Sequence, residues 1–169
     1  MTVPVAAPLR AARLLALAIP VIALAGAYIS QYGFGLHPCE MCWWQRYGQM
    51  FALPFAVLAF FWRPVRPLVA VAALGILSSG LIGGYHAGVE YGWWEGFTAC
   101  TASPFAAGTD PMAAIMAAPL IRCDVAPWTL GGISLAGFNF LLSTFGALAT
   151  FGLIARSNPS ASAIRGLTS

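Results

Sequence analysis

The chain has 169 residues, of which 60% are hydrophobic and only 8% are charged. Soluble domains carry about a quarter charged residues, so this composition excludes an ordinary soluble enzyme, a disordered chain and a nucleic-acid-binding protein. The mean hydropathy is +0.80, and the formal net charge of +3 arises from 8 basic against 5 acidic residues. Length and composition therefore predict one integral membrane domain.

Four apolar runs follow one another along the chain, at residues 14–33, 43–62, 68–89 and 130–154. Each reaches about 20 residues, the length of a helix that crosses a hydrocarbon core of about 30 Å. Backbone polar groups in lipid must bond within their own segment, so we expect helices. The predicted fold is an all-α membrane protein, a bundle of four transmembrane helices in a single domain 1–169. We expect the first run to be retained and not cleaved as a signal peptide.

The third run contains Gly80, Gly84 and Gly88, two overlapping GxxxG spacings. Small residues four positions apart form a flat stripe on a helix, which another backbone can approach closely. We interpret the stripe as a packing surface within the bundle.

Arginines gather on one side of the predicted bundle. Six of the 8 basic residues lie before the first run, between the second and third, or after the fourth, whereas the acidic residues fall toward the opposite ends. The positive-inside rule assigns the arginine side to the cytoplasm. We therefore expect both termini in the cytoplasm and the loops 34–42 and 90–129 outside it. The six arginines are Arg10, Arg13, Arg63, Arg66, Arg156 and Arg165.

All 4 cysteines lie in the two expected outer loops. Cys39 and Cys42 belong to the short loop, and Cys100 and Cys123 to the long loop, in which we also expect a short interfacial helix at 112–118. Two pairs of cysteines on the oxidising side favour disulfide chemistry. The two dithiols could exchange with each other, although a bond between the long-loop cysteines could also be a structural staple.

Cys39 and Cys42 form a CxxC motif where the second helix is expected to begin. This spacing can close a small, readily exchanged disulfide, and a helix N-terminus lowers the pKa of a nearby thiol. Arg46 lies one turn after Cys42 on the same face, and an arginine just inside an apolar helix normally has a partner. We expect that partner to be a Cys42 thiolate or a polar ligand. The alternatives are snorkelling to the headgroups or a pair with Glu40.

Other sulfur chemistry fits less well. Four thiolates could bind zinc, but Cys100 and Cys123 are too far apart for the usual two close pairs of ligands, so no metal site is expected. Position 43 is Trp, which excludes a CxxCH haem attachment, and no dinucleotide-binding motif is present.

The electron acceptor available in the lipid phase is a quinone. We expect its ring at the outer membrane boundary, near Cys42, Arg46 and His86. A hydrogen bond from the arginine or the histidine would favour the reduced forms of the ring.

The stretch HPCEMCWWQR at residues 37–46 resembles the signature of the disulfide bond formation protein B family (DsbB). The resemblance extends over about residues 10 to 155 and includes the four helices and the long second loop with two cysteines. It implies a thiol oxidase of the bacterial inner membrane, with cysteine loops in the periplasm. Such an oxidase reoxidises a soluble thioredoxin-fold dithiol oxidase (DsbA-like) and passes the electrons to ubiquinone or menaquinone.

The resemblance also implies a role for each cysteine. Cys100 would be attacked by the thiolate of the partner, and Cys123 would then attack Cys39. The implied catalytic residues are Cys39, Cys42, Cys100 and Cys123, and the implied quinone-binding residues are Cys42, Arg46 and His86.

Two other functions stay open at this point. The chain could be a membrane oxidoreductase that runs in the reducing direction, as vitamin K epoxide reductase does, or a bundle without enzymatic activity whose disulfides are structural. A redox titration would separate them, because structural bridges have potentials below about −300 mV.

Overall fold

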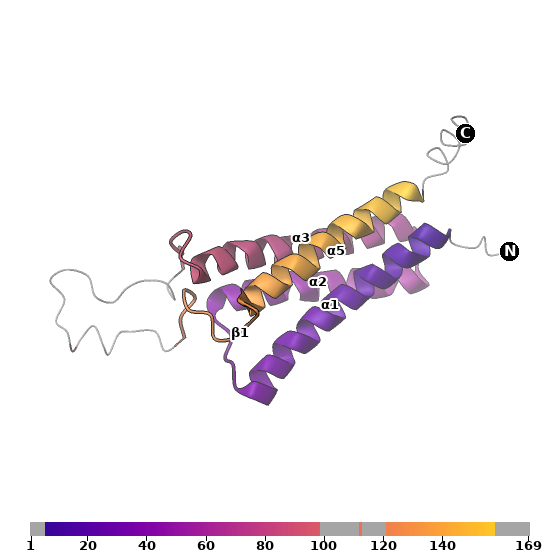
Figure 1. Ribbon diagram of the computed structural model, residues 1–169. Coiled ribbons are helices and arrows are strands. Elements are labelled where there is room, and N and C mark those ends of the chain that lie inside the picture. Colours follow the sequence, from indigo (N-terminus) through magenta and orange to yellow (C-terminus); the bar gives the residue numbers. More distant parts are fainter. Residues whose placement is uncertain (1–5, 99–111, 113–120, 158–169) are drawn as a thin grey trace.

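The computed structural model describes residues 6–98, 112 and 121–157, and long helices make up most of this part of the chain (Figure 1). Helix α3 packs against both α2 and α5, and α1 also packs against α2 and α5. These helices therefore form a bundle in which each contacts two neighbours extensively. The helices are α1 (Ala7–Phe34), α2 (Glu40–Phe61), α3 (Val65–Glu90) and α5 (Leu135–Arg156).

Three of the described helices, α1, α3 and α5, are long and apolar enough to cross a membrane. Helix α2 has 22 residues, but its first half carries Gln45, Arg46 and Gln49, which are buried inside the bundle. Large apolar side chains face outward instead, among them Leu81 and Phe145, which are 56% and 63% exposed. Apolar outer surfaces of this kind suit contact with lipid. The mostly helical membrane fold is thus confirmed, and a fourth span at 43–62 stays a prediction.

The first helix begins earlier than the hydropathy pattern predicts. Helix α1 starts at Ala7 and so includes Arg10 and Arg13. Arginine is a good helix former, and a proline in the first turn is compatible with the helix start. Hydropathy marks only the apolar part of a helix, which explains the difference.

The last helix begins later than predicted, at Leu135 and not at 130. Residues 129–134 form a small antiparallel hairpin, with strands β1 (Thr129–Leu130) and β2 (Ile133–Ser134). Gly131 and Gly132 form its turn with φ angles of 59° and 81°, a left-handed conformation that favours glycine. Ser134 then caps α5, since its Oγ accepts a hydrogen bond from the Gly137 N–H at 3.1 Å.

The described arginines of the predicted cytoplasmic side lie together at one end of the bundle. The start of α1, the turn from α2 to α3 and the end of α5 meet there (Figure 1). Arg66 donates to the carbonyl of Ser157, and the guanidinium of Arg13 lies 4.2 Å from the ring centroid of Phe60. The core at this end consists largely of small side chains, including Ala16, Ala56, Ala72 and Ala147.

The glycine stripe of α3 is a packing surface, as predicted. A Cβ atom at Gly80 would lie 2.8 Å from the backbone nitrogen of Thr144, and one at Gly84 would lie 2.7 Å from the ring of Phe140, both on α5. At Gly88 the obstacle is the Trp94 ring. The stripe therefore sets the close approach of α3 to α5 and to the loop that follows α3.

Candidate functional site

The CxxC motif lies at the start of α2, at the end of the bundle opposite the one that carries Arg13 and Arg66, which we call the arginine end. Cys39 is the N-cap residue of α2, and its sulfur accepts a hydrogen bond from the Cys42 N–H at 3.3 Å. Both cysteines are free thiols, with their sulfurs 2.8 Å apart. The helix N-terminus therefore contacts Cys39 directly. Even so, the hydrogen bond with the Cys42 sulfur and burial together raise the pKa of Cys39 above that of a free thiol.

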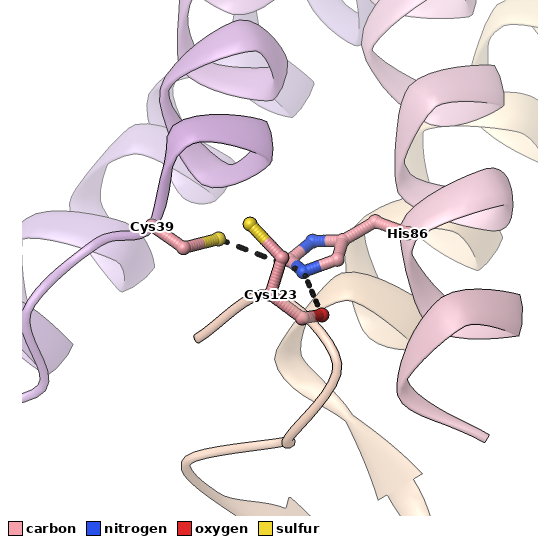
Figure 2. A group of neighbouring side chains, drawn as sticks. All are labelled: Cys39, His86 and Cys123. Atoms are coloured by element: carbon pink, nitrogen blue, oxygen red, sulfur yellow. Dashed lines mark hydrogen bonds between the residues drawn. The ribbon is translucent and has the colours of Figure 1, made fainter. Parts of the chain in front are cut away.

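His86 and Cys123 complete the buried part of this site. Cys39 Sγ, His86 Nε2 and Cys123 Sγ all lie within 4.8 Å of one another, and Figure 2 shows both cysteine sulfurs to the left of the histidine ring. His86 Nε2 is 3.6 Å from Cys39 Sγ and 3.2 Å from the carbonyl oxygen of Cys123. The segment that carries Cys123 is thus held against the start of α2. This brings together residues that are far apart in the sequence.

Cys123 itself is fully buried and disulfide-bonded. The Thr98 hydroxyl donates to its sulfur at 3.7 Å. Cys100 lies outside the described residues. Of the expected interfacial helix at 112–118, only Met112 belongs to them, and its side chain is exposed.

Arg46 is buried in the bundle and joins α2 to α1. Its Nη1 donates to Gln31 Oε1 at 2.5 Å and its Nη2 donates to the Ala27 carbonyl at 3.1 Å. The guanidinium carbon also lies 5.0 Å from the ring centroids of both Tyr28 and Trp43. Only 6% of Arg46 is exposed, and these hydrogen bonds go to Gln31 and Ala27 of α1, not to the Cys42 thiolate or the Glu40 carboxylate considered from the sequence. These two hydrogen bonds use two of the five N–H donors of a guanidinium, which leaves donors for a ligand.

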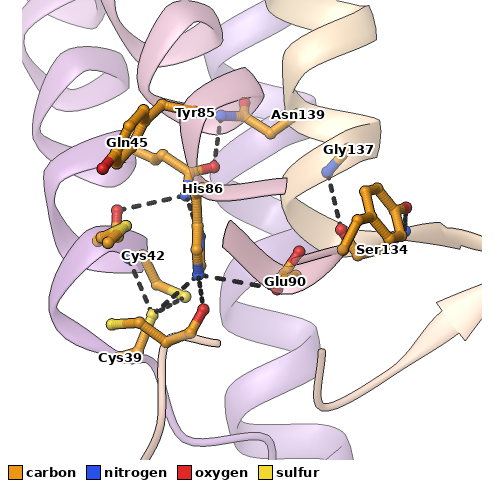
Figure 3. Close-up of polar contacts among 12 residues, drawn as sticks. Cys39, Cys42, Gln45, Tyr85, His86, Glu90, Ser134, Gly137 and Asn139 are labelled. Carbon is orange, nitrogen blue, oxygen red and sulfur yellow. Dashed lines mark hydrogen bonds and ion pairs between the residues drawn. The ribbon is translucent and has the colours of Figure 1, made fainter. Parts of the chain in front are cut away.

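A network of buried amides and hydroxyls crosses the bundle below the cysteines. Asn139 Nδ2 donates to Gln45 Oε1 at 2.8 Å, and Gln45 Nε2 lies 2.9 Å from His86 Nδ1 (Figure 3). One turn deeper, Gln49 Nε2 donates to the hydroxyls of Ser79 and Ser143 at 3.0 and 2.8 Å. Apart from His86, none of these residues was predicted from the sequence to belong to the site. The signal was present, because two polar side chains recur four positions apart on α2 and again on α5.

Two cavities meet at the CxxC motif. The first, of about 230 Å³, has walls from α1, α2, α3 and α5. Helix α1 diverges from the other helices at this end of the bundle (Figure 1). This first cavity is lined by Cys42, Arg46 and His86 and otherwise mostly by apolar side chains. The second, of about 380 Å³, is bounded by the CxxC motif and the loop segment after residue 120. Cys42, like His86, lines both cavities and therefore lies between the loop side of the site and the bundle interior.

Glu90, the last residue of α3, also lines both cavities. Its Oε1 is 3.7 Å from His86 Nε2, and its side chain is 2% exposed. Glu90 is thus an acidic group beside the thiols, and it was not predicted from the sequence.

The Cys39, His86 and Cys123 cluster has the spacing of metal ligands but not their chemical state. The sulfur of Cys123 is in a disulfide, and His86 Nε2 is directed at a carbonyl oxygen, which only accepts hydrogen bonds. Metal ions bind thiolates and unprotonated ring nitrogens. The arrangement therefore fits thiol chemistry better than metal binding.

Comparisons with known proteins agree with the cysteine pattern. A family model described as "Disulfide bond formation protein DsbB" matches residues 9–153. The chain is 27% identical over 135 residues to the uncharacterized protein RP370 of Rickettsia prowazekii (strain Madrid E), which covers 77% of this chain and 78% of that protein. No solved structure matches the chain.

Proposed function

Because the chain belongs to the DsbB family of disulfide bond formation proteins, we propose that it is a quinone-dependent protein thiol oxidase. It reoxidises a soluble periplasmic thioredoxin-fold dithiol oxidase of the DsbA type and transfers the electrons to ubiquinone or menaquinone. The observation that carries this proposal is the position of the CxxC motif. Its two free thiols lie between a loop cysteine on one side and a mostly apolar cavity on the other.

The sulfur relay runs from the long loop to α2. The partner thiolate attacks Cys100 of a Cys100–Cys123 disulfide and displaces Cys123, whose thiolate then attacks Cys39 of the oxidised Cys39–Cys42 disulfide and displaces Cys42. The proximity of the Cys123 and Cys39 sulfurs, within 4.8 Å, supports the second step. Each step replaces one disulfide by another, so it needs no external oxidant.

The cavity beside Cys42 has the chemistry that a quinone ring requires. Its walls are mostly apolar, and the Arg46 guanidinium is its cationic group. When bound, the quinone supplies an acceptor for two electrons and two protons. Cys42 would face the ring and Arg46 would hold a ring oxygen by a charge-assisted hydrogen bond. The raised pKa of Cys39 keeps that residue a thiol, so the negative charge of the reduced pair falls on Cys42.

The same family and the arginine distribution support a proposal for the cell compartment. We place the arginine end of the bundle in the cytoplasm and the cysteine end in the periplasm. The membrane is then the bacterial inner membrane, which four helices of one domain cross. A quinone in the bilayer would reach the cavity on the side where α1 diverges.

Quinone reduction by the reduced protein, reconstituted in lipid discs, tests this function. We expect the absorbance of oxidised ubiquinone-1 to fall when the reduced partner is added in the absence of oxygen. Cys42→Ser should abolish this fall. Arg46→Ala should raise KM for the quinone about tenfold or more, since hydrogen bonds to charged groups contribute about 1.5–3 kcal/mol.

Gln31→Leu is the matched control for Arg46, because it removes a hydrogen bond of the guanidinium but keeps the charge. It should change KM less than Arg46→Ala does. Normal quinone reduction by Cys42→Ser would refute the proposed electron path. Electron flow from quinol to the protein under the same conditions would favour the reducing function instead.

A further inference from the structure

A chain of hydrogen bonds connects α5 to the carbonyl group of Cys123. Asn139 Nδ2 donates to Gln45 Oε1 at 2.8 Å, Gln45 Nε2 lies 2.9 Å from His86 Nδ1, and His86 Nε2 lies 3.2 Å from Cys123 O. Its members come from α5, α2, α3 and the loop segment, in that order (Figure 3). Every link is buried or partly buried, so water competes little for these groups.

Two backbone carbonyls fix the direction of this chain. Asn139 Nδ2 also donates to the Ser79 carbonyl at 3.1 Å, and Gln45 Nε2 also donates to the Met41 carbonyl at 3.3 Å. A carbonyl only accepts, so turning either amide round would place two acceptors against each other. Gln45 must therefore donate to His86 Nδ1. The ring hydrogen is left on Nε2, which donates to the Cys123 carbonyl.

Both ring nitrogens of His86 are thus occupied by protein groups. Glu90 Oε1, at 3.7 Å from Nε2, is beyond hydrogen-bond distance, so the Cys123 carbonyl is the closer acceptor. A quinone oxygen would have to displace Cys123 in order to bind the ring. The hydrogen bond instead anchors the backbone of Cys123 beside Cys39, as Figure 2 shows.

We propose that His86, oriented by Gln45 and Asn139, is a positioning residue for disulfide exchange between Cys123 and Cys39. This inference rests on the proposed function and concerns one step of it. The Cys123 thiolate forms a bond with Cys39 Sγ as the Cys39–Cys42 bond breaks, and the electron pair of the broken bond stays on Cys42. His86 takes no proton in this step. It holds the attacking residue within reach.

The exchange can be observed without partner or quinone. In a Cys100→Ser background, Cys123 is free to exchange, and one equivalent of diamide introduces a single disulfide. Purified protein in lipid discs is shifted from about pH 4 to about pH 8, quenched with acid at intervals and alkylated, and its disulfides are mapped by peptide mass spectrometry. The readouts are the fraction of Cys39–Cys123 bond and its rate of formation.

We expect His86→Phe to lower that fraction about tenfold, since it removes the anchoring hydrogen bond and the partner of Gln45. His86→Gln should restore it to within about threefold of the parent, because its amide can accept from Gln45 and donate to Cys123. Gln45→Leu should give an intermediate loss. It also serves as the test variant if His86→Phe does not fold.

Tyr85→Phe is the control on the same helix, because it removes a hydrogen bond to a different loop carbonyl, that of Glu95. It should leave the exchange unchanged. Equal exchange in the parent, His86→Phe and Gln45→Leu would overturn the positioning role and leave the proposed function standing. The positioning role would also be overturned, with the proposed function left standing, if the only defect of the His86 variants were a raised KM for ubiquinone-1. Absence of the Cys39–Cys123 bond in the Cys100→Ser parent would instead contradict the relay of the proposed function.

Discussion

The two cysteines of the CxxC motif differ in environment although they are three residues apart. Cys39 is buried and caps α2, whereas Cys42 lies within the first turn and lines both cavities. An N-cap position favours a thiolate on Cys39, but the neighbouring sulfur and burial outweigh it and raise the pKa of Cys39. The difference between the two sulfurs is therefore set by their surroundings, not by the motif.

This difference predicts unequal alkylation of the reduced protein. A raised pKa keeps the thiolate fraction of Cys39 small until the pH is well above the range of an ordinary thiol. Between about pH 6 and pH 10 we expect iodoacetamide to modify Cys42 first, and labelling of Cys39 to keep rising with pH. Cys42→Ala removes the sulfur that raises the pKa, so it should speed labelling of Cys39 at a fixed pH. Equal labelling rates of the two cysteines would contradict this assignment.

At the scale of elements, α2 has two different faces. Gln45, Arg46 and Gln49 point into the bundle, while Phe51 and Phe61 are among its exposed apolar residues. The buried polar groups are satisfied by α1, α3 and α5, which fixes how α2 rotates about its axis. A polar stripe on a helix of this length would be costly in lipid, so it must face protein.

The candidate site also depends on the close packing of α3 against α5, because Asn139 on α5 must reach Gln45 across the bundle. A side chain at Gly80 would meet Thr144 Oγ1 at 2.6 Å from its Cβ atom. Gly80→Leu should therefore destabilise the protein by about 1–3 kcal/mol or more. Unfolding in detergent mixtures measures the loss.

Gly152→Leu on α5 is the matched control, because a Cβ there would meet no atom within 4 Å. It should leave stability nearly unchanged. A Gly80→Leu protein as stable as this control would show that the α3–α5 contact can relax.

At the scale of the whole molecule, the bundle separates two ends with different chemistry. The arginine end has a core of small apolar side chains, and the other end has thiols, amides and two cavities. Helix α1 is close to its neighbours at the first end and diverges at the second (Figure 1). This divergence makes room for the cavity beside Cys42.

The orientation of these ends in the membrane is testable with reporter fusions. Alkaline phosphatase fused within the loop between α3 and α5 should be active, and the same enzyme fused after residue 157 should be inactive, because it folds only outside the cytoplasm. A fluorescent protein should give the opposite pattern at the two positions. Reversal of both patterns would place the arginine end outside, against the positive-inside rule.

Composition and spacing alone determined much of this protein. Apolar runs of membrane-spanning length predicted the helices, the glycine stripe predicted a packing surface, and the CxxC with an arginine one turn later indicated the candidate site. These are local properties, since the period of a helix and the length of an apolar run are readable within one segment.

Only the tertiary structure decided which groups meet. The partners of Arg46 on α1, the contact of His86 with Cys123 and the amides from Asn139 to Gln45 each join segments far apart in the sequence. Such contacts depend on the rotation and approach of whole helices, which many weak packing interactions set together. No single residue pattern encodes them.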